Sequence, residues 1–131
     1  MSVILGLNTS HAGSSAALIV DGRIVAAIAE ERLNRVKYYA GFPRLAVAEC
    51  LNIAGLSFAD ITDVAVGRDS SANLAKKLEY AIKNPRKLLN LAKIQTSRSS
   101  LGDLQQLIAA ECGVANESLR FRQHNVEHHV A

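Results

Sequence analysis

Three apolar segments separated by two short turns, at the very start of the chain, constrain the fold more than any other feature. The segments are Val3–Asn8, residues 16–20 and residues 23–29. Asp21–Gly22 separates the last two, and Asp-Gly between apolar runs is a strong hairpin signal. The first two are joined by residues 9–15, which are small or hydroxylated apart from one histidine. We therefore expect three consecutive antiparallel strands that present a polar loop.

After these strands the sequence alternates between helical and extended patterns. Pro43 suits a first helical position and Gly55 a helix end, and Ser57 with Asp60 predicts a capping box around a single turn. The remaining expected elements are a strand at 64–66, helices at 74–82, 88–92 and 104–113, a strand at Arg120–Gln123 and a helix starting at Asn125. The order βββαβα(α)βα predicts an α/β domain with a mixed sheet. This pattern is typical of actin-like, sugar-kinase-like and ribonuclease-H-like folds, in which the first loop faces nucleotide phosphates.

Size and composition fit one globular domain covering residues 1–131. Trp is absent and aromatic residues make up 5%, which argues against a dedicated binder of single-stranded nucleic acid. The net charge of +3 does not by itself call for nucleic acid. Lys and Arg are concentrated between Lys76 and Arg98. Such a basic helical pair could contact RNA, a phosphorylated substrate or another domain, although a solvated helix face is the commoner explanation.

The two cysteines indicate a reducing compartment. Cys50 and Cys112 each lie among apolar helical residues, as buried free thiols do. The sequence has no signal-peptide pattern and no apolar run long enough to span a membrane, so we expect a cytoplasmic protein. It ends within an apolar, His-rich run, and we therefore expect a truncated domain.

The loop between the first two strands is the first candidate site. Its small residues would let the backbone approach an anion, and hydroxyls come from Thr9, Ser10, Ser14 and Ser15. An ordinary turn rich in Ser and Gly explains the same residues. A phosphotransferase of these folds would normally end its first strand with an Asp that organises hydrated Mg²⁺. Asn8 stands there instead, which argues against a kinase.

Histidines provide two further candidates. His11 lies at the apex of the loop and could accept a proton from an attacking hydroxyl; an exposed loop histidine is the alternative. His124 and His128 would share one helix face if the last helix starts early enough. They could then bind a metal, but two imidazoles do not complete a site. Polar histidines at a surface helix start, including His129, explain the pattern equally well.

Taken in order, these residues resemble the N-terminus of the O-carbamoyltransferases, which modify nodulation factors and antibiotics. The resemblance is carried by the first strand and loop up to His11, by the Ser15–Leu18 run, and by the Asp21–Gly22 turn. It continues with Ala29–Arg32, Arg35, Lys37, Gly41–Pro43 and the closing residues 126–131.

The resemblance implies a two-domain enzyme much longer than this chain. Its actin-like domain is joined to a YrdC-like domain that makes carbamoyl-adenylate from carbamoyl phosphate and ATP. The actin-like domain then passes the carbamoyl group to a substrate hydroxyl, beside a metal that is expected to be iron.

The resemblance also implies roles for individual residues. His11 matches the loop histidine, a base for the acceptor hydroxyl, and His128 matches the first ligand of an H-x-x-x-H metal motif. The second ligand of that motif would fall just past Ala131. Asn8, Thr9 and Ser10 line the loop, with Ser14 and Ser15 as further hydroxyl donors to the cofactor. Glu31, Arg32 and Lys37 match a charged signature to which we assign no role, and Gly13 stands where many relatives carry an acid.

We therefore expect the N-terminal lobe of a carbamoyltransferase, inactive on its own. The alternatives are another actin-like ATP-binding protein, such as a sugar kinase or a tRNA threonylcarbamoyladenosine subunit, and a non-catalytic domain that binds a partner.

Overall fold

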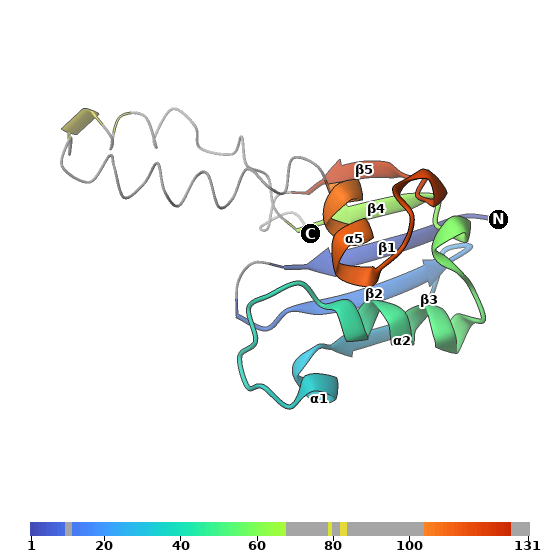
Figure 1. Cartoon of the computed structure of the whole chain (residues 1–131), viewed down its shortest axis with the longest axis horizontal. Helices are drawn as coiled ribbons and strands as arrows, with labels where there is room; N and C mark the ends of the chain where they lie inside the picture. Colours follow the sequence, from blue (N-terminus) through green and yellow to red (C-terminus); the bar gives the residue numbers. More distant parts are fainter. Residues whose placement is uncertain (10–11, 68–78, 80–81, 84–103, 127–131) are drawn as a thin grey trace.

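A five-stranded sheet forms the body of the protein (Figure 1). The computed structural model describes residues 1–9, 12–67, 79, 82–83 and 104–126. The strands are β1 (Val3–Asn8), β2 (Ser15–Val20), β3 (Arg23–Ala29), β4 (Asp63–Val66) and β5 (Arg122–Asn125).

The sheet is mixed, with strand order β3-β2-β1-β4-β5. β1, β2 and β3 are antiparallel neighbours, whereas β4 runs parallel to β1, and β5 runs parallel to β4. Asp21 and Gly22 both have positive φ, 49° and 79°, as a hairpin turn that follows the twist of its strands requires. The predicted α/β fold with a mixed sheet is confirmed.

The helical segments fill the connections between the strands. They are α1 (Glu31–Asn34), α2 (Arg44–Ala54), η1 (Phe58–Asp60), α5 (Leu104–Cys112) and η4 (Asn116–Ser118). Gly55 ends α2 in the left-handed conformation, with φ of 65°. The Ser57–Asp60 capping box is present around η1. Pro43 precedes the first residue of α2 instead of occupying it.

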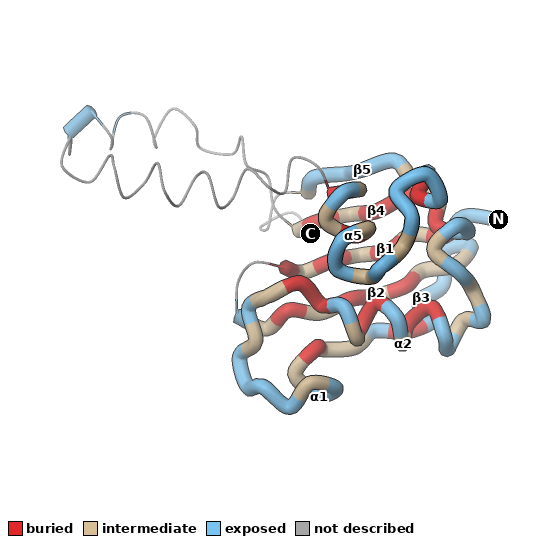
Figure 2. The backbone as a smooth tube through the Cα atoms, in the orientation of Figure 1, coloured by how far each residue is buried: buried red, intermediate tan, exposed pale blue. Residues whose placement is uncertain are grey.

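The hydrophobic core lies between the sheet and the pair α2 and α5, which cover the same face (Figures 1 and 2). Alternate strand residues point to opposite faces of a sheet, and on β1 the residues that reach this core are Val3, Leu5 and Leu7. Buried side chains of α2 and α5 meet them, among them Val47, Cys50, Leu104 and Ile108. Burial therefore divides the sheet into a covered face and an opposite face, which we call the open face.

The end of the chain corrects one expectation. β5 spans Arg122–Asn125 and not Arg120–Gln123, and η4 precedes it. Asn125 therefore belongs to a strand, and the prediction that a helix starts there is wrong. Residues 127–131 lie outside the described residues, as do most of the predicted helices at 74–82 and 88–92.

The predictions about the cysteines and about membrane-spanning segments can be compared with the described residues. Cys50 and Cys112 are both free. Where the structure describes helices, none is long and apolar enough to cross a bilayer.

Candidate functional site

The carboxyl ends of β1 and β4 define the candidate site. Because β1 and β4 are parallel, Asn8 and Gly67 come to the same edge of the sheet. Ligands of open α/β sheets bind outside this edge. Antiparallel pairing places Ser15, the first residue of β2, opposite Asn8. The fold thus brings the two predicted binding residues Asn8 and Ser15 side by side.

A groove of about 670 Å³ extends from this edge over the open face. Its lining is formed mainly by small residues: Gly6, Asn8, Ser15, Ala17, Ala27, Ala29, Ala65 and Gly67, with Val126, which follows β5. Asn8 and Ser15 give one end of the groove a polar character. The rest of it is apolar.

Thr9 and Ser14 are placed differently from Asn8 and Ser15. Both are buried, 3% and 1% exposed. The Ser14 hydroxyl donates to the carbonyl of Gly41 over 2.5 Å, and the Thr9 hydroxyl reaches the same oxygen at 3.4 Å. These hydroxyls therefore join the first loop to the segment before α2. Their predicted contact with a cofactor stays a prediction.

Backbone hydrogen bonds strengthen the same connection. The Ser14 amide donates to the carbonyl of Tyr39 over 3.1 Å, and the Glu30 amide donates to the carbonyl of Ser14 over 2.9 Å. The Asn8 side-chain amide donates to the carbonyl of Gly13 over 3.0 Å. Gly13 has φ of 86°, a conformation that an acidic residue would adopt only with strain. The backbone at this position therefore has a conformation that glycine adopts without strain.

Glu30 is a structural residue that the sequence did not single out. It is 3% exposed at the end of β3. Its Oε1 accepts a hydrogen bond from the amide of Leu45 over 3.1 Å, and its Oε2 accepts one from Ala46 over 2.7 Å. These are first-turn amides of α2, which lack partners within the helix. The N-cap position, Pro43, provides no side-chain hydrogen bond, so a distant carboxylate caps this helix.

Three predicted site residues lie outside the described residues: Ser10, the proposed base His11 and the proposed metal ligand His128. Their roles stay predictions. Among the described residues, no three His, Cys, Asp or Glu side chains are grouped so that they could hold a metal ion. The described residues therefore do not form a metal centre by themselves.

His124 has a partner that the sequence spacing did not reveal. It lies on β5, and its Nε2 is 2.8 Å from Oδ1 of Asp63 on β4. Arg122 also binds Asp63, with Nε 3.0 Å from Oδ1 and Nη2 3.1 Å from Oδ2. The prediction that His124 and His128 share a helix face is wrong, because His124 belongs to a strand.

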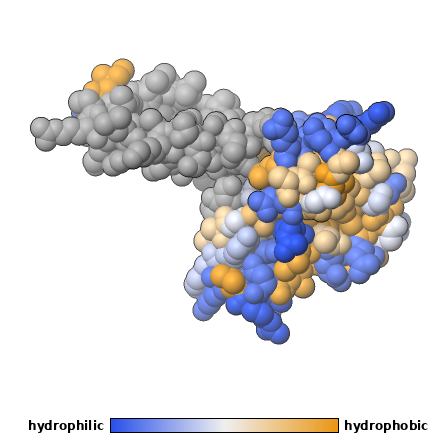
Figure 3. Space-filling view, viewed as in Figure 1, coloured by the Kyte–Doolittle hydropathy of each residue, from blue (hydrophilic) through white to orange (hydrophobic). Residues whose placement is uncertain are grey.

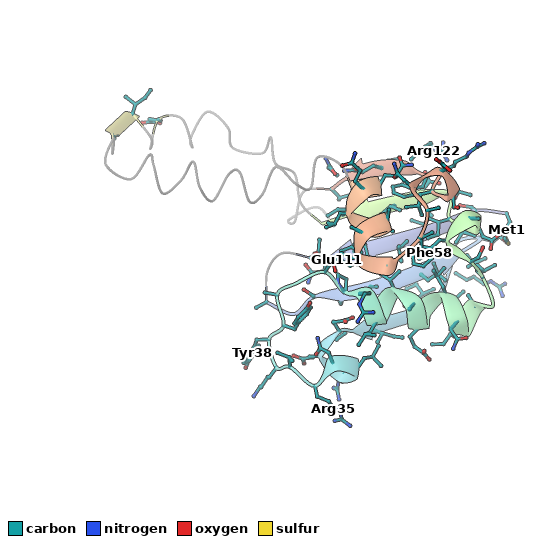
Figure 4. The ribbon with its side chains drawn as sticks, viewed as in Figure 1. Met1, Arg35, Tyr38, Phe58, Glu111 and Arg122 are labelled. Atoms are coloured by element: carbon teal, nitrogen blue, oxygen red, sulfur yellow. The ribbon has the colours of Figure 1, made fainter. Side chains whose placement is uncertain are left out.

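The same contacts set the charge of Asp63. Hydrogen bonds from His124, Thr62 and Arg122 lower the pKa of its carboxyl to about 2. Asp63 is therefore an anion at neutral pH, facing one guanidinium and one imidazole. Figure 4 shows Arg122 at the β5 edge of the sheet.

Glu31, Arg32 and Lys37, the residues that match the charged signature, form a turn beside the first loop. Oε2 of Glu31 accepts a hydrogen bond from the amide of Tyr38 over 3.1 Å. Lys37 lies over the Tyr38 ring, with Nζ 5.2 Å from the ring centre. Arg35 and Tyr38 both have positive φ, and their side chains point outwards (Figure 4). Glu31 thus has a structural role, because it binds the amide of Tyr38. We assign no role to Arg32.

The predicted basic helical pair falls mostly outside the described residues. Lys83 is described, and its Nζ lies 2.7 Å from Oε1 of Glu79, one helical turn away.

The chain is similar to a known protein family and to two known proteins. A family model described as Carbamoyltransferase N-terminus matches residues 3–129. An uncharacterized protein of Synechocystis sp. is 44% identical over 61 residues, which cover 47% of this chain and 10% of that protein. Nodulation protein NolNO of Sinorhizobium fredii is 41% identical over 58 residues, covering 44% of this chain and 8% of NolNO. The aligned stretches thus span about a tenth of these two relatives.

Two solved structures from Pseudomonas aeruginosa are also similar. YeaZ has a TM-score of 0.36 at 27% identity, covering 53% of this chain and 30% of YeaZ. An uncharacterized protein with similarity to peptidase YeaZ has a TM-score of 0.43 at 21% identity, covering 95% of this chain and 44% of its own.

Proposed function

The chain belongs to the carbamoyltransferase family, and we propose that it is the N-terminal part of an enzyme that transfers a carbamoyl group to a hydroxyl of a small molecule. The donor is carbamoyl-adenylate, made from carbamoyl phosphate and ATP by a YrdC-like domain elsewhere in the protein. The acceptor is a sugar-like or antibiotic-like molecule. The observation that carries the proposal is the family match over nearly the whole chain.

The geometry supports a site for transfer chemistry at the carboxyl edge of β1 and β4. The first loop is held to the segment before α2 through Ser14 and Gly41, so its ends have fixed positions. A rigid support is what a reacting group on such a loop needs. Asn8, at the end of β1, can offer its carbonyl oxygen while its amide nitrogen binds Gly13.

In the proposed reaction, His11 accepts the proton of the acceptor hydroxyl as the oxygen attacks the carbamoyl carbon. The bond from that carbon to the phosphate oxygen of the adenylate breaks, and AMP leaves. General bases with a pKa near the working pH suit this step. His128, as one ligand of a metal that is expected to be iron, would add positive charge near the adenylate. Because Asn8 is neutral, it does not repel an anionic adenylate. A carboxylate at this position would need Mg²⁺ between itself and the adenylate.

The experiment compares two half-reactions in the protein that carries this chain. Carbamoyl phosphate-dependent release of pyrophosphate from ATP reports adenylate formation, and carbamoylation of the acceptor reports transfer. His11→Ala should abolish transfer and leave pyrophosphate release intact. Loss of both half-reactions, or of neither, would contradict the proposed role of His11.

Metal content provides a second readout. His128→Ala should lower the bound metal measured by elemental analysis, and His129→Ala, its neighbour, is the matched control that should retain it. The 131-residue chain alone should release no pyrophosphate from ATP and carbamoyl phosphate. Turnover by this chain would contradict its assignment as a fragment.

A further inference from the structure

Residues 31–38, which we call the basic turn, leave the first loop and return to it. The amide of Glu30, just before the basic turn, donates to the carbonyl of Ser14 over 2.9 Å. The amide of Ser14 donates to the carbonyl of Tyr39, just after the basic turn, over 3.1 Å. Both ends are thus bonded to one residue of the first loop. The basic turn therefore lies beside the candidate site, at the end of the sheet where β1 ends (Figure 1).

Hydrogen bonds within the basic turn fix its backbone. The amide of Arg35, which has φ of 62°, donates to the carbonyl of Glu31 over 3.1 Å. The amide of Val36 donates to Oδ1 of Asn34 over 2.9 Å. The amide of Tyr38 donates to Oε2 of Glu31 over 3.1 Å. The side chains of the basic turn therefore extend from a backbone whose conformation is held by several internal bonds.

The basic turn carries three cations against one carboxylate. Arg32, Arg35 and Lys37 are all exposed, and none of them has an acidic partner among the described residues. The carboxylate is that of Glu31, which is already bound to the amide of Tyr38. Figure 3 shows mainly hydrophilic residues along the lower edge of the molecule, where α1 lies. The basic turn thus adds uncompensated positive charge beside the candidate site.

Lys37 is the most favourably placed of the three cations. It is two residues before Tyr39, whose carbonyl is bonded to the first loop. Its Nζ lies 5.2 Å from the centre of the Tyr38 ring, a distance at which an aromatic ring attracts an ammonium group. Figure 4 shows Tyr38 at the end of the molecule where β1 ends, and Arg35 at the lower edge. Lys37 is therefore held on the same side of the molecule as the candidate site.

We propose that the basic turn binds the phosphate group of a ligand at the candidate site, with Lys37 as the main contact. An ammonium group donates charge-assisted hydrogen bonds to phosphate oxygens. Uncompensated cations at the rim of a site also raise the local concentration of anions. A nucleotide and carbamoyl phosphate share this phosphate chemistry. The inference rests on the proposed function only for the identity of the ligand, since phosphate binding requires no turnover.

A titration of the 131-residue chain, followed by amide NMR spectra, tests the proposal. The probes are AMP, inorganic phosphate and adenosine, which separate the phosphate group from the nucleoside. We expect saturable shifts of the amides of residues 35–38 with AMP and with inorganic phosphate, and none with adenosine. Tighter binding of AMP would identify a nucleotide as the source of the phosphate, and equal binding would identify a small phosphate. Equal shifts with adenosine, or no saturable shift with either phosphate probe, would overturn the proposal.

Substitutions assign the binding to Lys37. Lys37→Gln should weaken AMP binding about tenfold, because a charge-assisted hydrogen bond is lost. Lys37→Arg keeps the charge and should bind AMP nearly as well as the unsubstituted chain.

The matched control is Arg23→Gln, which removes the same charge from an exposed residue at the other end of β3. It should leave AMP binding unchanged, and a loss equal to that of Lys37→Gln would contradict a local site. The titration does not measure carbamoyl transfer. Its failure is therefore distinguishable from failure of the proposed function, which depends on transfer by the protein that carries this chain.

Discussion

The carboxylate of Glu30 and the backbone amide of Ala46 are joined by a 2.7 Å hydrogen bond at the first turn of α2. The other oxygen of the same carboxylate binds the amide of Leu45. A residue at the end of β3 therefore performs the capping that Pro43 cannot perform. The negative charge also lies at the positive end of the helix dipole. This contact links the third strand to the helix that covers the sheet.

Removal of the Glu30 carboxylate should destabilise the fold. Glu30→Ala leaves two amides of α2 without partners, and we expect a loss of about 1–3 kcal/mol in the free energy of unfolding. Glu30→Gln keeps one acceptor oxygen and should lose less. Urea unfolding followed by circular dichroism measures both. Glu117→Ala, on the exposed surface, is the control; an equal loss in that variant would contradict the capping role.

Ser14 should matter more for stability than its neighbour Ser15. Ser14→Ala leaves the Gly41 carbonyl with the longer Thr9 contact alone, and we expect a loss of about 1–2 kcal/mol in unfolding free energy. Ser15→Ala, on the groove side, should lose less. Chemical denaturation of both variants decides the point, and the reverse ranking would show that the Ser14–Gly41 bond does not hold the loop.

The low pKa of Asp63 predicts an acid-sensitive contribution to stability. A carboxyl with pKa of about 2 in the folded chain and about 3.9 in the unfolded chain stabilises the fold fully above pH 4. That contribution is lost as the pH falls through about 2, because the unfolded state then binds the proton more readily.

The measurement is the difference in unfolding free energy between the unsubstituted chain and Asp63→Asn as a function of pH. The difference should stay constant from pH 7 to about pH 4 and then shrink towards pH 2. A difference that is independent of pH over this range would contradict the ion pair. Glu117→Gln, in an exposed position, should show no comparable trend.

Cys112 should react slowly with alkylating reagents. Burial raises the pKa of its thiol to about 11, so the reactive thiolate is roughly 0.1% of the population at pH 8. Burial also raises the pKa of the Cys50 thiol. Mass spectrometry after timed iodoacetamide treatment should show both thiols reacting far more slowly than glutathione. Alkylation of Cys112 at the rate of glutathione would show that this thiol is not shielded.

The sequence by itself determined the elements whose causes are local. Alternating burial along β1, the Asp21–Gly22 turn, the glycine that ends α2 and the Ser57–Asp60 box each depend on residues close together in the chain. The order of these elements was enough to predict the mixed α/β sheet. Among the described elements, β5 was displaced and the helix expected from Asn125 was wrong, because the alternating Arg, Phe and Arg are a weak pattern.

Only the tertiary structure decided which polar groups meet. Glu30 reaches Ala46 across 16 residues, Ser14 reaches Gly41 across 27, and His124 reaches Asp63 across 61. Such pairs arise where strands and loops from distant parts of the chain are packed together, and no local periodicity encodes them. For the same reason the sequence grouped Asn8, Thr9, Ser14 and Ser15 as one set of ligand donors. The fold separates them into two residues that line a groove and two that hold the loop in place.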